Sequence, residues 1–119
     1  MLKKNCLLSM SEERDGLMIV VSGEIDHHSA VWVRNEIDAK ISELHPTRAV
    51  MDMSGIEFMD SSGLGLIMGR YSKMKAVGGE LALLNPSDRL LRIFTLAGLE
   101  KIVRIEYSAD MKKENKYEN

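Results

Sequence analysis

Two short polar stretches hold the side chains that could take part in chemistry. The segment FMDSSGLG, residues 58–65, places Asp60 beside the hydroxyls of Ser61 and Ser62, and glycines follow. The segment GEIDHHSA, residues 23–30, carries two carboxylates and two histidines. Serines beside an acid could act as nucleophiles, contact a phosphate, cap a helix or be modified themselves.

The enzymatic motifs that contain serine or glycine fit these residues poorly. A nucleophile-elbow hydrolase needs Gly-x-Ser-x-Gly and a later histidine, but no histidine follows Ser61. A phosphate-binding P-loop needs a lysine that the segment GLGLIMGRY lacks, and Gly63, Gly65 and Gly69 resemble a dinucleotide fingerprint only loosely. We therefore expect no catalytic residue and no cofactor, and we interpret these glycines as allowing a helix to approach the sheet closely.

The adjacent histidines His27 and His28 are poorly placed to share a metal ion. Their side chains diverge, and no cysteine or acid stands beside them at metal-ligand spacing, so we expect no metal site. A polar turn at a helix start, capped by Asp26 or Ser29, is the simpler interpretation. Capping is also the simplest role for the polar residues at positions 60–62.

Five short runs rich in Leu, Ile, Val and Met have the length of strands, and they cover residues 5–10, 17–23, 49–53, 80–84 and 102–107. The Asp15-Gly16 pair predicts a tight turn and an antiparallel hairpin between the first two. The later strands alternate with helices. This order predicts an α/β fold, a single domain with a mixed, mostly parallel five-stranded sheet and helices packed on it. Residues 1–107 would form this domain, and the polar residues 108–119 a frayed tail.

Three helices are predicted between these strands. The first runs from residue 30, with a buried stripe at positions 33, 37, 41 and 44 and with Trp32 partly exposed on the opposite side. The second runs from residue 62 to a stop at Gly78, with an inner face at positions 64, 67, 68, 71 and 74. The third begins at NPSD, with Asn85 as its cap, Pro86 in its first turn and a stripe at positions 90, 91, 94 and 97.

The two polar stretches follow the second and third predicted strands directly. In open α/β sheets, ligands and partners meet the edge formed by the carboxyl ends of the strands. If the two strands are parallel neighbours, that edge brings together the following residues: Glu24, Asp26, His27, Asp60, Ser61 and Ser62.

Composition limits the partners further. The 119 residues carry a net charge of −2 with no basic block, which argues against nucleic acid. Cys6 is the only cysteine, which fits a reducing compartment, and no apolar run has the length of a membrane span. We expect a cytoplasmic protein that is monomeric when free.

Four segments in order, GEIDHHSA, FMDSSGLGLIMGRY, GGELAL and RLLRIFTLAGL, resemble the anti-sigma factor antagonist family, which is built on the STAS domain. The resemblance covers about residues 7–107. Within the family, the double histidine and the double serine followed by Gly-Arg-Tyr resemble the sporulation members more than the general-stress members.

The resemblance implies a partner switch rather than an enzyme. The unphosphorylated antagonist would bind an anti-sigma factor that is also a serine kinase and so release a sigma factor, sigma F in the sporulation branch. The kinase would then phosphorylate the first serine of the motif, here Ser61, and a PP2C-type phosphatase would restore it. The residues expected to contact the partner are Glu24, Asp26, His27, Met59, Asp60, Ser61 and Ser62. A small-ligand or nucleotide-binding STAS module, or an antagonist in a general-stress sigma system, is the alternative.

Overall fold

The computed structural model describes residues 5–14 and 16–109. The predicted turn residue Asp15 and the predicted frayed end beyond residue 109 lie outside the described residues. In chain order the elements are β1 (Cys6–Glu13), β2 (Gly16–Ile25), α1 (His27–Leu44), β3 (Arg48–Met59), α2 (Ser61–Ala76), β4 (Glu80–Leu84), α3 (Asp88–Leu96), the 3₁₀ turn η2 (Leu99–Lys101) and β5 (Arg104–Glu106).

The five strands form one sheet in the order β1-β2-β3-β4-β5. β1 pairs antiparallel with β2, and the remaining neighbours pair in parallel. Glu13 pairs with Gly16, so β1 and β2 form the predicted hairpin. Each parallel connection passes through a helix. The predicted α/β class, with a mixed and mostly parallel sheet, is therefore confirmed.

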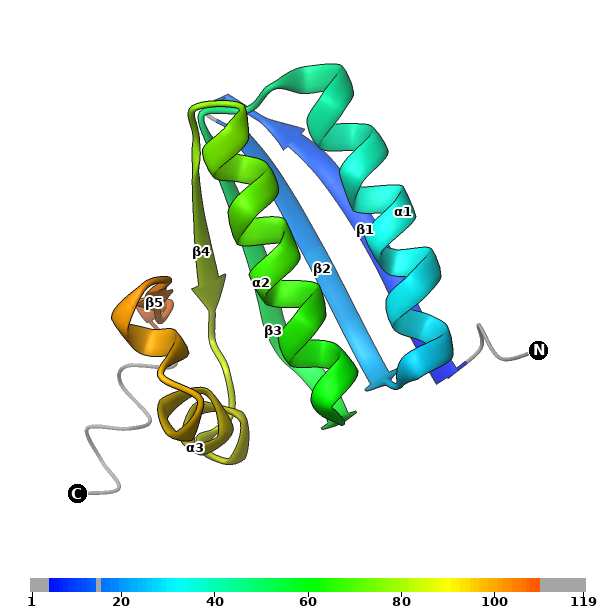
Figure 1. Cartoon of the computed structure of the whole chain (residues 1–119), viewed down its shortest axis with the longest axis vertical. Coiled ribbons are helices and arrows are strands. Elements are labelled where there is room, and N and C mark those ends of the chain that lie inside the picture. The colour runs from blue at the N-terminus through cyan, green and yellow to red at the C-terminus, as the bar shows by residue number, and fades with distance from the viewer. Residues whose placement is uncertain (1–4, 15, 110–119) are drawn as a thin grey trace.

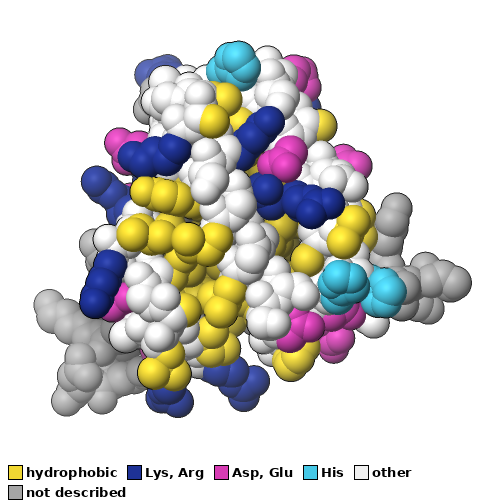
Figure 2. Space-filling model, viewed as in Figure 1, with side chains coloured by type: hydrophobic (Ala, Val, Ile, Leu, Met, Phe, Trp, Pro, Cys, Tyr) yellow, Lys and Arg dark blue, Asp and Glu magenta, His cyan; other side chains and the backbone are white. Residues whose placement is uncertain are grey.

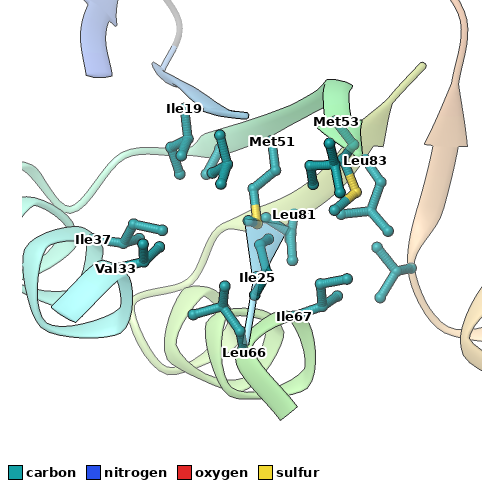
Figure 3. Close-up of a cluster of buried hydrophobic side chains, with 14 of the residues drawn as sticks. Ile19, Ile25, Val33, Ile37, Met51, Met53, Leu66, Ile67, Leu81 and Leu83 are labelled. Atoms are coloured by element: carbon teal, nitrogen blue, oxygen red, sulfur yellow. The ribbon is translucent and has the colours of Figure 1, made fainter. Parts of the chain in front are cut away.

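Helices α1 and α2 lie side by side on one face of the sheet, and α3 lies beyond the carboxyl end of β4 (Figure 1). The core fills the space between the sheet and these two helices (Figure 3). Alternate residues of β2 and β3 point into it, as the period of a strand requires. Its buried members include Ile19, Val21, Val33, Ile37, Ile41, Met51, Met53, Ile67 and Leu83. The predicted stripe of α1 is thus buried, apart from its half-buried last member, Leu44.

Three strands run further than the sequence predicted, β1 to Glu13 and the next two to the polar edge, whereas β5 is shorter than the predicted 102–107. β2 continues to Ile25 and β3 to Met59, because their pairing resumes after two shifts in register. Gly23 lies at one of these shifts with φ 91°, and a Cβ at this position would stand 2.1 Å from the carbonyl oxygen of Asn5. Only glycine fits there. The extensions matter because they carry both strands out to the polar edge.

The inner face of α2 differs from the predicted one. Of the predicted residues, Ile67 and Met74 are buried, but Met68 is 39% exposed. The helix instead turns Gly63, Leu66 and Arg70 inward. α2 packs against α1 as well as against the sheet, so its buried face is wider and turned from the one that sheet packing alone predicts.

The start of α3 was also predicted wrongly. Ser87 caps this helix by accepting the N–H of Leu90 at 3.2 Å, and the helix begins at Asp88. Asn85, the predicted cap, is buried with φ 56°, and its side-chain Oδ1 accepts the N–H of Ser108 at 2.9 Å. It therefore ties the end of β4 to the segment after β5.

Among the described residues, no helix combines the length and the apolar character that crossing a bilayer requires.

Candidate functional site

The two polar stretches meet at one edge of the sheet, as predicted. In the parallel β2–β3 pair, Glu24 stands opposite Phe58 and Ile25 opposite Met59. One residue further on, the N–H of Asp60 donates to the carbonyl oxygen of Ile25 at 3.2 Å. The first residues of α1 and α2 follow directly, so the N-termini of these two helices lie side by side at this edge.

Asp26 forms the start of α1. Its Oδ1 accepts the N–H of Ser29 at 2.9 Å, and its own N–H donates to the Ser29 hydroxyl at 2.9 Å. These two bonds make a reciprocal capping box, so both residues proposed as the cap take part. The buried Ser29 hydroxyl also donates to the carbonyl oxygen of Glu24 at 3.2 Å, which fixes the turn between β2 and α1.

The carboxylate of Asp26 is held in its ionised form. The backbone N–H of Ser29 is the largest influence, and it lowers the pKa of Asp26 below the ordinary value because it bonds the charged form. Asp26 thus carries a negative charge at this edge throughout the physiological pH range.

Asp60 caps α2 in a similar way, with Oδ1 accepting the N–H of Ser62 at 2.8 Å. Ser61 is the first residue of the helix and is exposed, whereas Ser62 is half-buried. The Ser61 hydroxyl forms no hydrogen bond with any other described residue. The capping role and the exposed hydroxyl therefore belong to different residues. Asp60 accepts a backbone N–H of the first turn, and the Ser61 side chain faces solvent.

Met59 packs against the first turn of α2. It is only 7% exposed, and a Cβ added to Gly63 would stand 2.1 Å from its Cγ. The predicted close approach therefore holds at Gly63. It is wrong at Gly65 and Gly69, where an added Cβ would meet nothing within 4 Å. Gly65 is exposed and Gly69 is half-buried, so neither glycine is needed for a close approach.

An ion pair between a buried arginine and a half-buried aspartate, which sequence reasoning did not find, joins α2 to α1. Arg70 is 5% exposed, and its Nε lies 2.8 Å from Oδ1 of Asp38. Its other end groups donate to Oδ2 of Asp38 and to the carbonyl oxygen of Leu66, each at 3.2 Å. The available signal was an arginine interrupting an apolar helix, with an acid near the middle of the preceding helix.

The remaining predicted contact residues, Glu24 and His27, are exposed. His28 is exposed beside them, and the two imidazole rings meet edge to face with centroids 5.8 Å apart. Figure 2 shows histidine and acidic side chains gathered at the end of the molecule where α1 begins. The edge is thus predominantly acidic around an exposed hydroxyl.

This arrangement suits the acceptance of a phosphoryl group better than catalysis. Helix N-termini offer free N–H groups and a positive dipole end, which stabilise an anion such as a phosphate. Within the described residues, no base lies within hydrogen-bond distance of the Ser61 hydroxyl to activate it as a nucleophile.

The family model for the STAS domain matches residues 9–111. The chain belongs to the anti-sigma factor antagonists. It is 37% identical to the anti-sigma F factor antagonist of Paenibacillus polymyxa, over 85% of this chain and 86% of that one. It is 40% identical to the same antagonist of Lysinibacillus sphaericus, over 72% and 74% of the two chains. An anti-sigma-B factor antagonist of Listeria monocytogenes also matches, at 34% identity over 79% and 82%.

Among solved structures, the antagonist SpoIIAA in its unphosphorylated form superposes with a TM-score of 0.76, at 28% identity over 94% of this chain and 96% of that one. SpoIIAA of Bacillus in its phosphorylated form gives a TM-score of 0.71, at 28% identity over 93% and 99%. The fold of this antagonist therefore extends along nearly the whole of both chains. Proteins of this family are regulators that act through anti-sigma factors, not typical enzymes.

Proposed function

We propose that this antagonist is switched by phosphorylation of Ser61. In its unphosphorylated form it binds an anti-sigma factor that is also a serine kinase, and so releases the sigma factor, which we take to be sigma F. A PP2C-type phosphatase restores the unphosphorylated form. The switch operates in the cytoplasm. The observation that carries the proposal is the exposed Ser61 hydroxyl at the first position of α2.

The phosphoryl transfer itself needs no catalytic group from this chain. Oγ of Ser61 attacks the γ-phosphorus of ATP, the bond to the β–γ bridging oxygen breaks, and ADP leaves. The kinase supplies the base that receives the hydroxyl proton. Ser61 is favoured over Ser62 because Ser61 is exposed, whereas Ser62 is half-buried.

A phosphate on Ser61 would end binding because this serine enters the kinase's catalytic cleft, next to the negative phosphates of the bound nucleotide. Phosphoserine adds about −1.5 to −2 charges at neutral pH. A hundredfold loss of affinity corresponds to about 2.8 kcal/mol. One like charge about 6 Å away repels by about that amount at an effective dielectric constant of about 20. The fold need not change.

The proposal is tested by incubating the chain with its cognate anti-sigma factor and ATP, followed by mass spectrometry. We expect one phosphate on Ser61, none in Ser61→Ala, and normal modification of the matched control Ser62→Ala. Ser61→Asp should bind the ADP-loaded kinase weakly. Phosphate on Ser62 or Ser72 would refute the assignment. Release of sigma B rather than sigma F from the complex would place the chain in the general-stress branch.

A further inference from the structure

A groove runs between the end of β3 and helix α3, at the same edge of the sheet as Ser61. Its volume is about 570 Å³. The apolar side chains that line it are Ile56, Phe58, Met59, Leu90 and Ile93, and Glu57, Asp88 and Arg89 lie among them. Phe58 is 49% exposed, although it is a large aromatic side chain on a strand. An exposed aromatic beside an apolar groove is typical of a contact surface.

The groove is continuous with the phosphorylation site. Met59 lines it and also packs beneath Gly63 in the first turn of α2. Three peptide units separate Phe58 from Ser61, so their Cα atoms are at most about 11 Å apart. A protein interface of ordinary size covers about 800 Å² on each partner, which corresponds to a disc with a radius of about 16 Å. A kinase that receives Ser61 in its catalytic cleft therefore reaches the groove as well.

The surface of α3 extends this apolar strip. Arg89, Ile93 and Leu96 stand at i, i+4 and i+7, and so share one face of the helix. Leu96 is 83% exposed. Leu96 thus lies about one turn beyond Ile93 on the same side of α3.

The charges around the groove indicate what kind of surface it meets. Glu57 and Asp88 lie in it against a single cation, Arg89. Glu24, Asp26 and Asp60 continue the acidic character past Ser61. A partner that covers both places must present basic side chains around its apolar contact.

We propose that this groove docks an apolar side chain of the anti-sigma factor kinase, flanked by basic residues. The inference rests on the proposed function and adds to it a second contact point. Phe58 is the central aromatic residue of the contact. The groove stabilises the kinase-bound ground state and the transition state of phosphorylation by the same amount. Loss of the groove contact therefore raises KM and leaves kcat unchanged.

The test measures binding to the ADP-loaded cognate anti-sigma factor, and KM and kcat for phosphorylation with ATP. Phe58→Ala should raise Kd and KM about tenfold or more, the loss expected of a central interface aromatic. Glu57→Lys changes an exposed charge without touching the core, and it should raise both values in the same direction. The matched controls are Ile102→Ala, since Ile102 is 45% exposed, and Glu80→Lys. Both lie in a separate pocket at the amino ends of β4 and β5, and should leave Kd and KM unchanged.

Circular dichroism melts establish that each variant is folded. Folded Phe58→Ala and Glu57→Lys chains with wild-type KM would overturn the docking site while leaving Ser61 as the acceptor. A wild-type dimer that Phe58→Ala abolishes, with KM unchanged, would overturn it in favour of a second copy of this chain. A wild-type chain that the kinase neither binds nor phosphorylates would overturn the proposed function and the groove together.

Discussion

The three glycines of α2 are predicted to respond to the same substitution with opposite signs. Replacing glycine by alanine within a helix stabilises it by about 1 kcal/mol. At Gly65 and Gly69 the new methyl group meets nothing within 4 Å, so this gain should be retained. At Gly63 the new Cβ stands 2.1 Å from Cγ and 2.5 Å from Sδ of Met59. Overpacking of this kind costs about 1–3 kcal/mol, which exceeds or cancels the gain.

Thermal and urea denaturation followed by circular dichroism measure these differences. Gly65→Ala and Gly69→Ala should each raise the midpoint of thermal unfolding by about 3–5 °C, and Gly63→Ala should leave it unchanged or lower it. A double-mutant cycle with Met59→Ala separates sterics from helix propensity. The cavity left by Met59 accepts the new methyl group, so the double variant should be about 1–2 kcal/mol more stable than the sum of the single effects predicts. If Gly63→Ala stabilises as much as Gly65→Ala does, or if the cycle is additive, the close packing beneath the helix start is refuted.

Two further predictions concern the parts that position the site. Arg70→Ala leaves the half-buried carboxylate of Asp38 without its cation and also removes apolar volume, so it should cost about 1–3 kcal/mol in urea unfolding. Arg70→Met keeps the apolar volume and should cost clearly less; equal losses would show that the lost cation alone accounts for the effect. The pKa of Asp26 is lowered in the folded state, so its ionised carboxylate adds stability above the unfolded pKa of about 3.9, and this is lost as pH falls through the lower folded pKa. Between about pH 5 and 8 the pH lies above both pKa values, so the difference in unfolding free energy between the wild type and Asp26→Ala should be constant there. The difference should shrink below about pH 4. A difference that grows on acidification would contradict the capping role.

The edge that holds the candidate site was predictable because it depends on chain connectivity. Two polar turns, each between an apolar strand and a helix, must share an edge once the strands are parallel neighbours. The caps Asp26 and Asp60 were equally local, since each bonds an N–H two or three residues away.

The features that sequence reasoning missed depend on contacts between distant segments. Asparagine is a common helix-cap residue, but Asn85 instead forms a hydrogen bond with Ser108, 23 residues further along the chain. The inner face of α2 could not be read from periodicity, because apolar residues surround most of that helix and α1 decides which of them are covered. The groove beside Phe58 requires the placement of α3, which no local pattern specifies.

The ordered start of α2 determines what kind of substrate Ser61 would be for the proposed kinase. Its conformation is fixed during folding by the Asp60 cap, by the packing of Met59 against Gly63 and by the Arg70–Asp38 pair, none of which involves a partner. Under the proposed function, a kinase would therefore recognise a rigid three-dimensional surface instead of an extended sequence. A free peptide of residues 56–66 would contain every residue of the motif, but helices shorter than about 12–15 residues are marginal in water. Such a peptide would present the same serine without its shape, and a search for linear phosphorylation motifs would overlook the site.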